Sequence, residues 1–257
     1  MKTIFTIIFM SAAVFVSAQN FFIAHRGASY DAPENTLAAA NLAWETGADA
    51  VEVDIYLSSD HRVMVMHDKS TKRTCGGEGY VIKDTPSDVL RKLDAGSWKN
   101  ASFIGEKIPF LEEVISTVPK GKKLVVEIKC GTEVFPYLEP IVAKTKKKSR
   151  IIFISFDWEV ILKAKKIFPD NKAYWLSSDK KLALQKLPLA KEAGLDGINM
   201  QYSAIDADLF AAARQHQLEV LAWTVDNPEE AKRLINLGVT HITTNRPAWL
   251  KQQLTTK

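Results

Sequence analysis

The sequence contains little cysteine, little net charge and no apolar run long enough to cross a membrane. Two of its 257 residues are cysteines, Cys75 and Cys130, and neither has a second cysteine at a metal-ligand spacing. This pattern argues against a zinc site. A net charge of +4 gives no basis for nucleic-acid binding. A membrane-spanning helix would need about 20 apolar residues, more than the N-terminal run provides.

The first eighteen residues have the pattern of an export signal. Lys2 gives a positive start, residues 4–16 are mostly apolar, and residues 16–18 supply small side chains where a signal peptidase cuts. No cysteine lies near this junction, which argues against a lipoprotein anchor. We therefore expect residues 1–18 to be a signal peptide and the mature chain to be periplasmic or secreted, without a stable membrane anchor. An exported chain could pair Cys75 with Cys130, and the sequence leaves that pairing open.

Eight short apolar, β-branched runs alternate with helical patterns along the chain. Six of the seven intervals between their starts are 21–29 residues long, and one is 74. Strands that alternate with helices predict a parallel sheet, and eight of them close a TIM (β/α)8 barrel, which commonly uses about 250 residues. We therefore expect an α/β fold with one TIM-barrel domain over residues 19–257. The predicted strands start at Phe21, Ala50, Leu124, Ile151, Ala173, Asp196, Glu219 and Thr240.

The 74-residue interval predicts a small insertion after the second strand, over about residues 56–110. Residues 62–66 form a ninth strand candidate that ends at His67, and a turn signal at residues 58–60 predicts a hairpin. Such a hairpin would bring His67 back to the level of Asp54. We expect the rest of the insertion to form a small lobe over the barrel mouth, after which residues 111–118 resume the helical pattern.

Two carboxylates in the second predicted strand share one face. Glu52 and Asp54 stand two residues apart and project to the same side, while their apolar neighbours, residues 51, 53 and 55, project to the other. Bare anions are costly to bury among apolar side chains, and a hard divalent cation is the usual compensation. The pair therefore predicts a metal site.

Barrel enzymes place their chemistry at the carboxyl ends of the strands. Three carboxylates, two histidines, an arginine and a lysine around one cavity suit a metal that holds an anionic, phosphate-bearing substrate. A second interpretation is a buried ion cluster of the carboxylates with the two cations, but such clusters seldom stabilise a fold on balance. The strand-end residues are His25, Arg26, Glu52, Asp54, Glu127, Lys129, Ser155, Asp157, Asn199, Trp223, Asp226, Thr244 and Asn245, joined by His67 from the hairpin.

Seven short motifs follow one another along the chain. They are His25-Arg26-Gly27, Pro33-Glu34-Asn35-Thr36, Glu52-Val53-Asp54, His67-Asp68, Ile108-Pro109, Glu127-Ile128-Lys129 and Trp223-Thr224-Val225-Asp226. In this order they resemble the motifs of the glycerophosphodiester phosphodiesterases, over essentially the whole mature chain. The resemblance implies a TIM barrel with an insertion after the second strand. It also implies hydrolysis of glycerophosphodiesters, the deacylated remains of phospholipids, to glycerol 3-phosphate and an alcohol.

The resemblance also implies a metal and an acid–base pair. Glu52, Asp54 and Glu127 would hold one divalent cation, Ca²⁺ or Mg²⁺. His25 and His67 would be the acid–base pair, in which one imidazole takes a proton from the attacking oxygen and the other gives one to the leaving alkoxide. An ordinary histidine pKa of about 6.5 suits both roles. The attacking group, water or the glycerol 2-hydroxyl, stays open.

Substrate contacts follow from the same resemblance. Arg26 would fork onto the phosphate, Lys129 would add a point charge, and Trp223 would form a wall of the glycerol pocket. Glu34 would orient Arg26 or a ligand from behind. The expected partner is a small-molecule glycerophosphodiester and no nucleic acid, and the sequence does not encode the oligomeric state.

Two alternative functions use the same residues. A phospholipase D-like enzyme would keep the barrel and metal but act on an intact lysophospholipid or sphingolipid. Such relatives usually need an apolar rim, for which Phe103, Ile104, Phe110 and Leu111 are the candidates. A non-catalytic binder of phosphorylated ligands would keep the barrel and is expected to lose a histidine or a carboxylate, and none is missing here.

Overall fold

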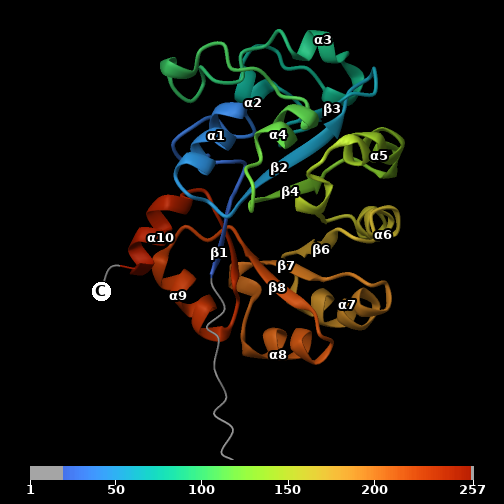
Figure 1. Ribbon diagram of the computed structural model, residues 1–257, viewed down its shortest axis with the longest axis vertical. Coiled ribbons are helices and arrows are strands. Elements are labelled where there is room, and N and C mark those ends of the chain that lie inside the picture. Colours follow the sequence, from blue (N-terminus) through green and yellow to red (C-terminus); the bar gives the residue numbers. More distant parts are fainter. Residues whose placement is uncertain (1–19, 256–257) are drawn as a thin grey trace, which may run out of the picture.

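Within residues 20–255, which the computed structural model describes, eight parallel strands close into a barrel (Figure 1). The order around the barrel is β1-β9-β8-β7-β6-β5-β4-β2, and β1 pairs with β2 to close it. This confirms the predicted TIM barrel, whereas the predicted signal peptide lies outside the described residues. The strands are β1 (Phe21–Ala24), β2 (Ala50–Leu57), β4 (Lys123–Ile128), β5 (Ile151–Ser155), β6 (Lys172–Ser177), β7 (Gly197–Gln201), β8 (Glu219–Trp223) and β9 (His241–Thr244).

The barrel strands begin within one residue of their predicted starts. The prediction works because β-branched and apolar residues suit a strand that is buried on both faces, as strands of a parallel barrel are. In β2 all eight residues are buried, including two carboxylates. The hydrophobic runs therefore predicted the positions of the strands.

Helices surround the barrel between successive strands (Figure 1). Several begin at a side chain that accepts a hydrogen bond from a free amide, as Asn227 does for α9, which ends at Gly238 with φ 107°. Among the described residues, no helix combines the length and apolar character needed to cross a bilayer. The helices are α1 (Leu37–Glu45), α4 (Leu111–Thr117), α5 (Phe135–Lys144), α6 (Trp158–Ile167), α7 (Lys180–Glu192), α8 (Ala207–Gln215), α9 (Pro228–Leu237) and α10 (Pro247–Thr255).

Alternating residues of each strand serve two separate apolar layers. One side packs against the helices and forms the large outer core, to which Val51, Val53 and Ile55 of β2 belong. The other side fills the barrel axis with a smaller cluster that includes Ile154, Leu176 and other aliphatic side chains. Inward-facing side chains near the carboxyl ends of the strands therefore point into the barrel mouth.

The segment between β2 and α4 begins with the predicted hairpin. Strand β3 (Val63–Val65) runs antiparallel to β2 with Ile55 opposite Val65, and the Met66 amide donates to the Asp54 carbonyl over 3.0 Å. The next residue, His67, therefore lies beside Asp54 at the barrel mouth, which confirms the predicted fold of the hairpin.

The rest of the insertion is a lobe of short elements beside β2 and β3 (Figure 1). Its own small core packs around Met64, Ile82 and Leu90. Cys75 and Cys130 both pack against this core as unpaired thiols, and burial raises their pKa values to about 11 and about 12. The short elements are α2 (Lys72–Cys75), η1 (Ile82–Asp84), α3 (Ser87–Leu90) and η2 (Ala101–Phe103).

A left-handed corner after β1 turns the chain at the barrel mouth. Arg26 and Gly27 have φ values of 56° and 81°. A Cβ atom on Gly27 would lie 2.6 Å from the Ala39 carbonyl carbon of α1, so glycine is required for both conformation and space. The corner therefore aims Arg26 into the mouth while α1 packs directly behind it.

We expect Gly27→Ala to lower the free energy of unfolding by about 3 kcal/mol or more. The substitution adds a backbone clash to the cost of a left-handed alanine, which is about 1–2 kcal/mol. Gly47→Ala is the matched control, because Gly47 has φ 85° and open space around its Cα. Chemical denaturation of both variants measures the difference. Equal losses would show that contact with Ala39 is not the constraint.

Candidate active site

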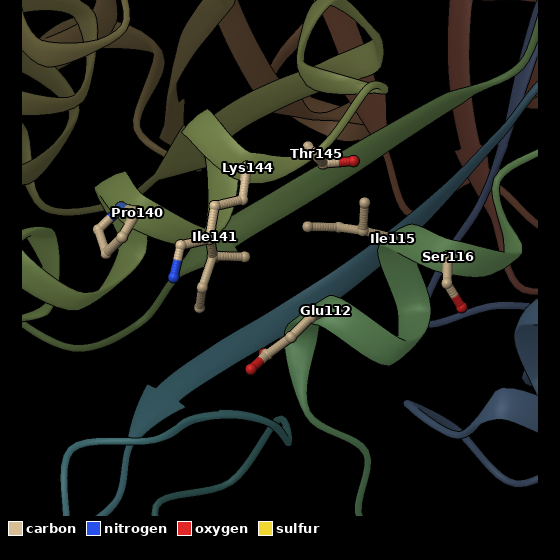
Figure 2. Close-up of a pocket in the computed structure, with 7 residues that line it drawn as sticks. All are labelled: Glu112, Ile115, Ser116, Pro140, Ile141, Lys144 and Thr145. Carbon is tan, nitrogen blue, oxygen red and sulfur yellow. The ribbon is translucent and has the colours of Figure 1, made fainter.

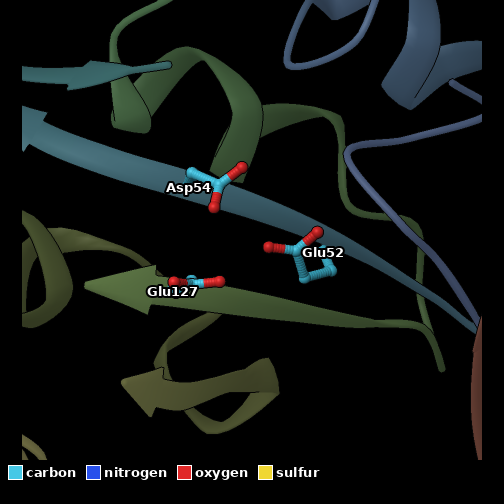
Figure 3. A group of neighbouring side chains, drawn as sticks. All are labelled: Glu52, Asp54 and Glu127. Atoms are coloured by element: carbon cyan, nitrogen blue, oxygen red, sulfur yellow. The ribbon is translucent and has the colours of Figure 1, made fainter. Parts of the chain in front are cut away.

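Three carboxylates, two from the middle of β2 and one from the carboxyl end of β4, converge on one point (Figure 3). The strands pair with Asp54 opposite Glu127, and Glu52 lies two residues earlier on the same face of β2. One oxygen from each side chain lies within 4.8 Å of the others. The sequence predicted that Glu52 and Asp54 share one face of their strand. The pairing of β2 with β4 adds Glu127 as the third carboxylate.

The acidic group is buried and strongly self-repelling. The side chains of Asp54 and Glu127 are 1% and 12% exposed. Burial, followed by the charges of Asp54 and Glu127, raises the pKa of Glu52 well above its usual range. Burial and Asp54 likewise raise the pKa of Glu127 to about 7. A cation between these oxygens would remove the repulsion.

Two nearby cations offset only part of this negative charge. Lys129 Nζ lies 3.2 Å from Glu127 and 3.5 Å from Asp54, and Arg26 Nε lies 3.6 Å from Asp54. Glu52 Oε2 accepts from the Arg26 amide, but its buried Oε1 has no hydrogen-bond partner among the described residues. A purely structural ion cluster would leave this oxygen unsatisfied, whereas three oxygen donors fit a hard divalent cation.

Asn35 fixes the Asp54 carboxylate in place. Its Nδ2 donates to Asp54 Oδ2 over 2.8 Å, and its Oδ1 accepts from the Asp54 amide over 3.1 Å. Asn35 has φ 58°, a conformation that asparagine tolerates better than most residues. The sequence predicts no role for Asn35, because a contact between the loop before α1 and strand β2 leaves no local pattern.

A chain of hydrogen bonds fixes the tautomer of His25. Asn245 Nδ2 donates to Asp226 Oδ2 over 2.5 Å, so its Oδ1 is the atom that meets His25 Nδ1, at 2.7 Å. Because that oxygen can only accept, His25 carries its proton on Nδ1, and Nε2 is left with a free lone pair. Burial and the neighbouring Arg26 lower the pKa of His25 to about 4, so the ring is neutral at neutral pH.

A second polar chain holds His67 and crosses the rim to Arg26. His67 Nδ1 lies 2.6 Å from Asp68 Oδ1, and Arg73 binds both Asp68 and Glu34. Glu34 in turn accepts from Arg26 Nη1 over 2.9 Å. The insertion is thereby tied to the loop after β1, and the predicted contact of Glu34 with Arg26 is present.

These side chains surround one small cavity of about 130 Å³ at the barrel mouth. The structure thus gathers most of the predicted site residues, with Asp54 and Glu34 just behind the wall. Two other strand-end candidates serve the fold instead, since Ser155 Oγ donates to the Ile128 carbonyl and Asp157 caps α6. The cavity is lined by His25, Arg26, Glu52, His67, Glu127, Lys129, Ile154, Phe156, Leu176, Asn199, Trp223, Thr224 and Thr243.

Two larger cavities differ in their relation to this site. One of about 450 Å³ adjoins it behind Lys129 and is walled by the hairpin turn and the insertion, including Lys69 and Val81. Another of about 470 Å³ lies between α4 and α5, where Glu112 and Ile115 face Ile141 (Figure 2). None of the candidate catalytic residues lines the cavity between α4 and α5.

Residues 25–249 match the model of the glycerophosphoryl diester phosphodiesterase family. The chain belongs to this family. It is 36% identical over 233 residues to the glycerophosphodiester phosphodiesterase of Caldanaerobacter subterraneus subsp. tengcongensis. The match covers 89% of this chain and 95% of that protein. The chain is 31% identical to a Bacillus subtilis glycerophosphodiester phosphodiesterase, over 88% of this chain and 83% of the relative.

A solved structure has the same fold as this family member. It is an Oleispira antarctica phosphodiesterase in complex with the product sn-glycerol-3-phosphate, with a TM-score of 0.85 and 28% sequence identity. The match covers 93% of this chain and 98% of the other. The resemblance inferred from seven motifs is therefore confirmed at the level of family and fold.

We expect Arg73→Gln to lower the free energy of unfolding of this family member at neutral pH by about 1 kcal/mol. Although burial acts to raise it, Arg73 and Arg26 lower the pKa of Glu34 to about 2, and the bond from Arg73 lowers the pKa of Asp68 to about 2. Depressed carboxyl pKa values stabilise the fold above pH 4.5, and this stabilisation is lost as pH falls toward 2.

The difference between wild type and Arg73→Gln should therefore narrow between about pH 4.5 and 2, as urea unfolding at a series of pH values will show. Lys72→Gln is the matched control, since it removes the same charge one residue away without an ion pair to any described carboxylate. A pH-independent difference would contradict this account of Arg73.

Proposed function

We propose that this chain hydrolyses glycerophosphodiesters to glycerol 3-phosphate and an alcohol with the aid of one divalent cation, Ca²⁺ or Mg²⁺. The observation that carries the proposal is the buried carboxylate group with its unsatisfied Glu52 oxygen, beside two oriented histidines in one cavity. Family membership and the product complex of the Oleispira antarctica phosphodiesterase support the substrate class. We further propose that the chain is exported through residues 1–18 and acts in the periplasm or outside the cell.

Glu52, Asp54 and Glu127 would hold the cation. A bound divalent cation there supplies positive charge to the phosphate oxygens as negative charge develops on them. Asn35 keeps Asp54 in its ligating orientation, and the Arg26 amide does the same for Glu52 Oε2. The protein contribution is thus a rigid set of oxygen donors that needs no rearrangement on binding.

His25 is suited to be the general base and His67 the general acid. Nε2 of His25 accepts the proton of the attacking oxygen, water or the glycerol 2-hydroxyl, as that oxygen forms its bond to phosphorus. The bond from phosphorus to the leaving oxygen breaks, and His67 Nε2 gives that oxygen a proton. Attack by water gives glycerol 3-phosphate directly, whereas attack by the 2-hydroxyl gives a cyclic phosphate that water then opens to glycerol 3-phosphate. Asp68 accepts from His67 Nδ1, so the imidazolium form is paired before transfer.

Arg26 and Lys129 supply the remaining positive charge for the phosphate. Arg26 Nε lies 3.6 Å from Asp54 but makes no hydrogen bond among the described residues, so its N–H can still donate to an anionic oxygen. Glu34 holds the other end of the guanidinium. Trp223, fixed by its Nε1 bond to the Asn199 carbonyl and packed edge-on against Phe156, forms the wall of the glycerol pocket.

Removal of the divalent cation tests the proposed metal dependence. Residues 19–257 should release glycerol 3-phosphate from glycerophosphocholine with Ca²⁺ or Mg²⁺, and EDTA should abolish the release. The same ion at 100 times its Kd should stabilise the fold by about 2.7 kcal/mol in thermal unfolding. Glu52→Gln should lose most of both effects while keeping the bond to the Arg26 amide.

Glu112→Gln is the matched control for the metal experiment, because Glu112 forms an exposed ion pair with Arg62 away from the site. Activity that persists in EDTA would contradict metal dependence. Absence of release under every condition would favour an intact lipid as substrate, tested with sphingomyelin and lysophosphatidylcholine. Binding of phosphorylated ligands without any turnover would favour the non-catalytic binder.

Substitution of each histidine tests the proposed acid–base roles. His25→Asn and His67→Asn should each lower kcat by about 10²–10⁴-fold, because each removes one proton transfer. Metal-induced thermal stabilisation should persist in both variants, which separates catalysis from metal binding. His216→Asn, at the end of α8 and far from the cavity, is the control and should keep wild-type kcat. Full activity in either site variant would overturn the acid–base assignment.

A further inference from the structure

Asn199 is a polar residue within the aliphatic inner layer of the barrel. It lies on β7 between Leu176 of β6 and Leu221 of β8, which are its partners in the strand register. Its sequence neighbours Ile198 and Met200 belong to the outer core, so the Asn199 side chain points to the barrel axis. A leucine-sized aliphatic side chain would suit this position if packing alone decided it.

The Oδ1 atom of Asn199 has no hydrogen-bond partner among the described residues. The residue is 2% exposed. The carboxamides of Asn35, Asn171 and Asn245 are each hydrogen-bonded, as buried amides normally are. Asn199 also lines the active-site cavity, so its carboxamide borders the space where substrate would bind.

The strand order places Asn199 across the cavity from the acidic group. Strand β7 is four strands from β2 in either direction around the barrel, so the two are diametrically opposite. The walls on the β7 side are neutral, with Ile154, Leu176 and Trp223, whereas the β1, β2 and β4 side carries every charged group of the lining. A phosphodiester held by the charged side would extend an uncharged part toward Asn199.

We propose that Asn199 hydrogen-bonds a hydroxyl group of the glycerol moiety and selects substrates that carry it. The inference rests on the proposed phosphodiesterase function. A carboxamide can accept and donate, and so can a hydroxyl, so either orientation of the amide makes the contact. Asn199 is thus a specificity-determining residue, and the neighbouring aliphatic walls accommodate the carbon atoms of glycerol.

The test compares Asn199→Leu with wild type on matched substrates. They are glycerophosphocholine and its two deoxy analogues, the phosphocholine esters of propane-1,2-diol and propane-1,3-diol. Wild type should prefer glycerophosphocholine over one analogue by at least about 10-fold in kcat/KM, because a site built to bind a hydroxyl discriminates against its absence. In Asn199→Leu, kcat/KM should fall on glycerophosphocholine and stay unchanged on the analogues, so that the preference is lost.

Asn171→Leu is the matched control. Asn171 is buried before β6, and its Nδ2 donates to the carbonyls of Lys148 and Ile151 at the other end of the barrel. This variant should lose stability but keep the wild-type ratio of kcat/KM values. Asn199→Ala provides a second variant that requires no extra space if the leucine does not fold.

The outcomes separate this inference from the function on which it rests. Equal loss of kcat/KM on all three substrates, or an unchanged preference in both Asn199 variants, would overturn the role of Asn199 while leaving the phosphodiesterase activity in place. No hydrolysis by wild type would overturn the proposed function and this inference with it. Loss of preference in Asn199→Leu or Asn199→Ala with a folded protein would support it.

Discussion

The barrel mouth depends on the repulsion among three buried carboxylates. Strand register holds Glu52, Asp54 and Glu127 within 4.8 Å of one another, in surroundings where desolvation already disfavours their charge. Arg26 and Lys129 compensate part of this, and neither reaches the free Glu52 oxygen. The neighbouring loops therefore also hold the three carboxylates in place against their mutual repulsion.

Closure of the barrel places the charged residues of its mouth on one side and the neutral residues on the other. The charged residues come from β1, β2, β4 and the hairpin, and the neutral wall comes from β5 to β8 on the far side. A phosphodiester has the same division, with an anionic centre and an uncharged glycerol arm. Both histidines, His25 and His67, line the same cavity as the charged half.

The sequence predicts what depends on local periodicity. Alternation in β2 placed Glu52 and Asp54 on one face, and the turn at residues 58–60 placed His67 beside them. It does not predict contacts that join distant loops, such as Asn35 with Asp54, Asn245 with His25, or Arg73 with Glu34. These arise when the barrel closes, so no spacing within one segment encodes them.

The unsatisfied atoms of the site differ in chemical kind, and this difference carries information about the ligand. Among the described residues, four buried side-chain atoms have no hydrogen-bond partner, and three belong to residues that line the cavity: Arg26 Nε, Glu52 Oε1 and Asn199 Oδ1. Such atoms are rare in folded proteins. An anionic acceptor suits a cation, a guanidinium donor suits an anion, and a neutral amide suits a hydroxyl. The proposed complex of a divalent cation with a glycerophosphodiester would supply all three.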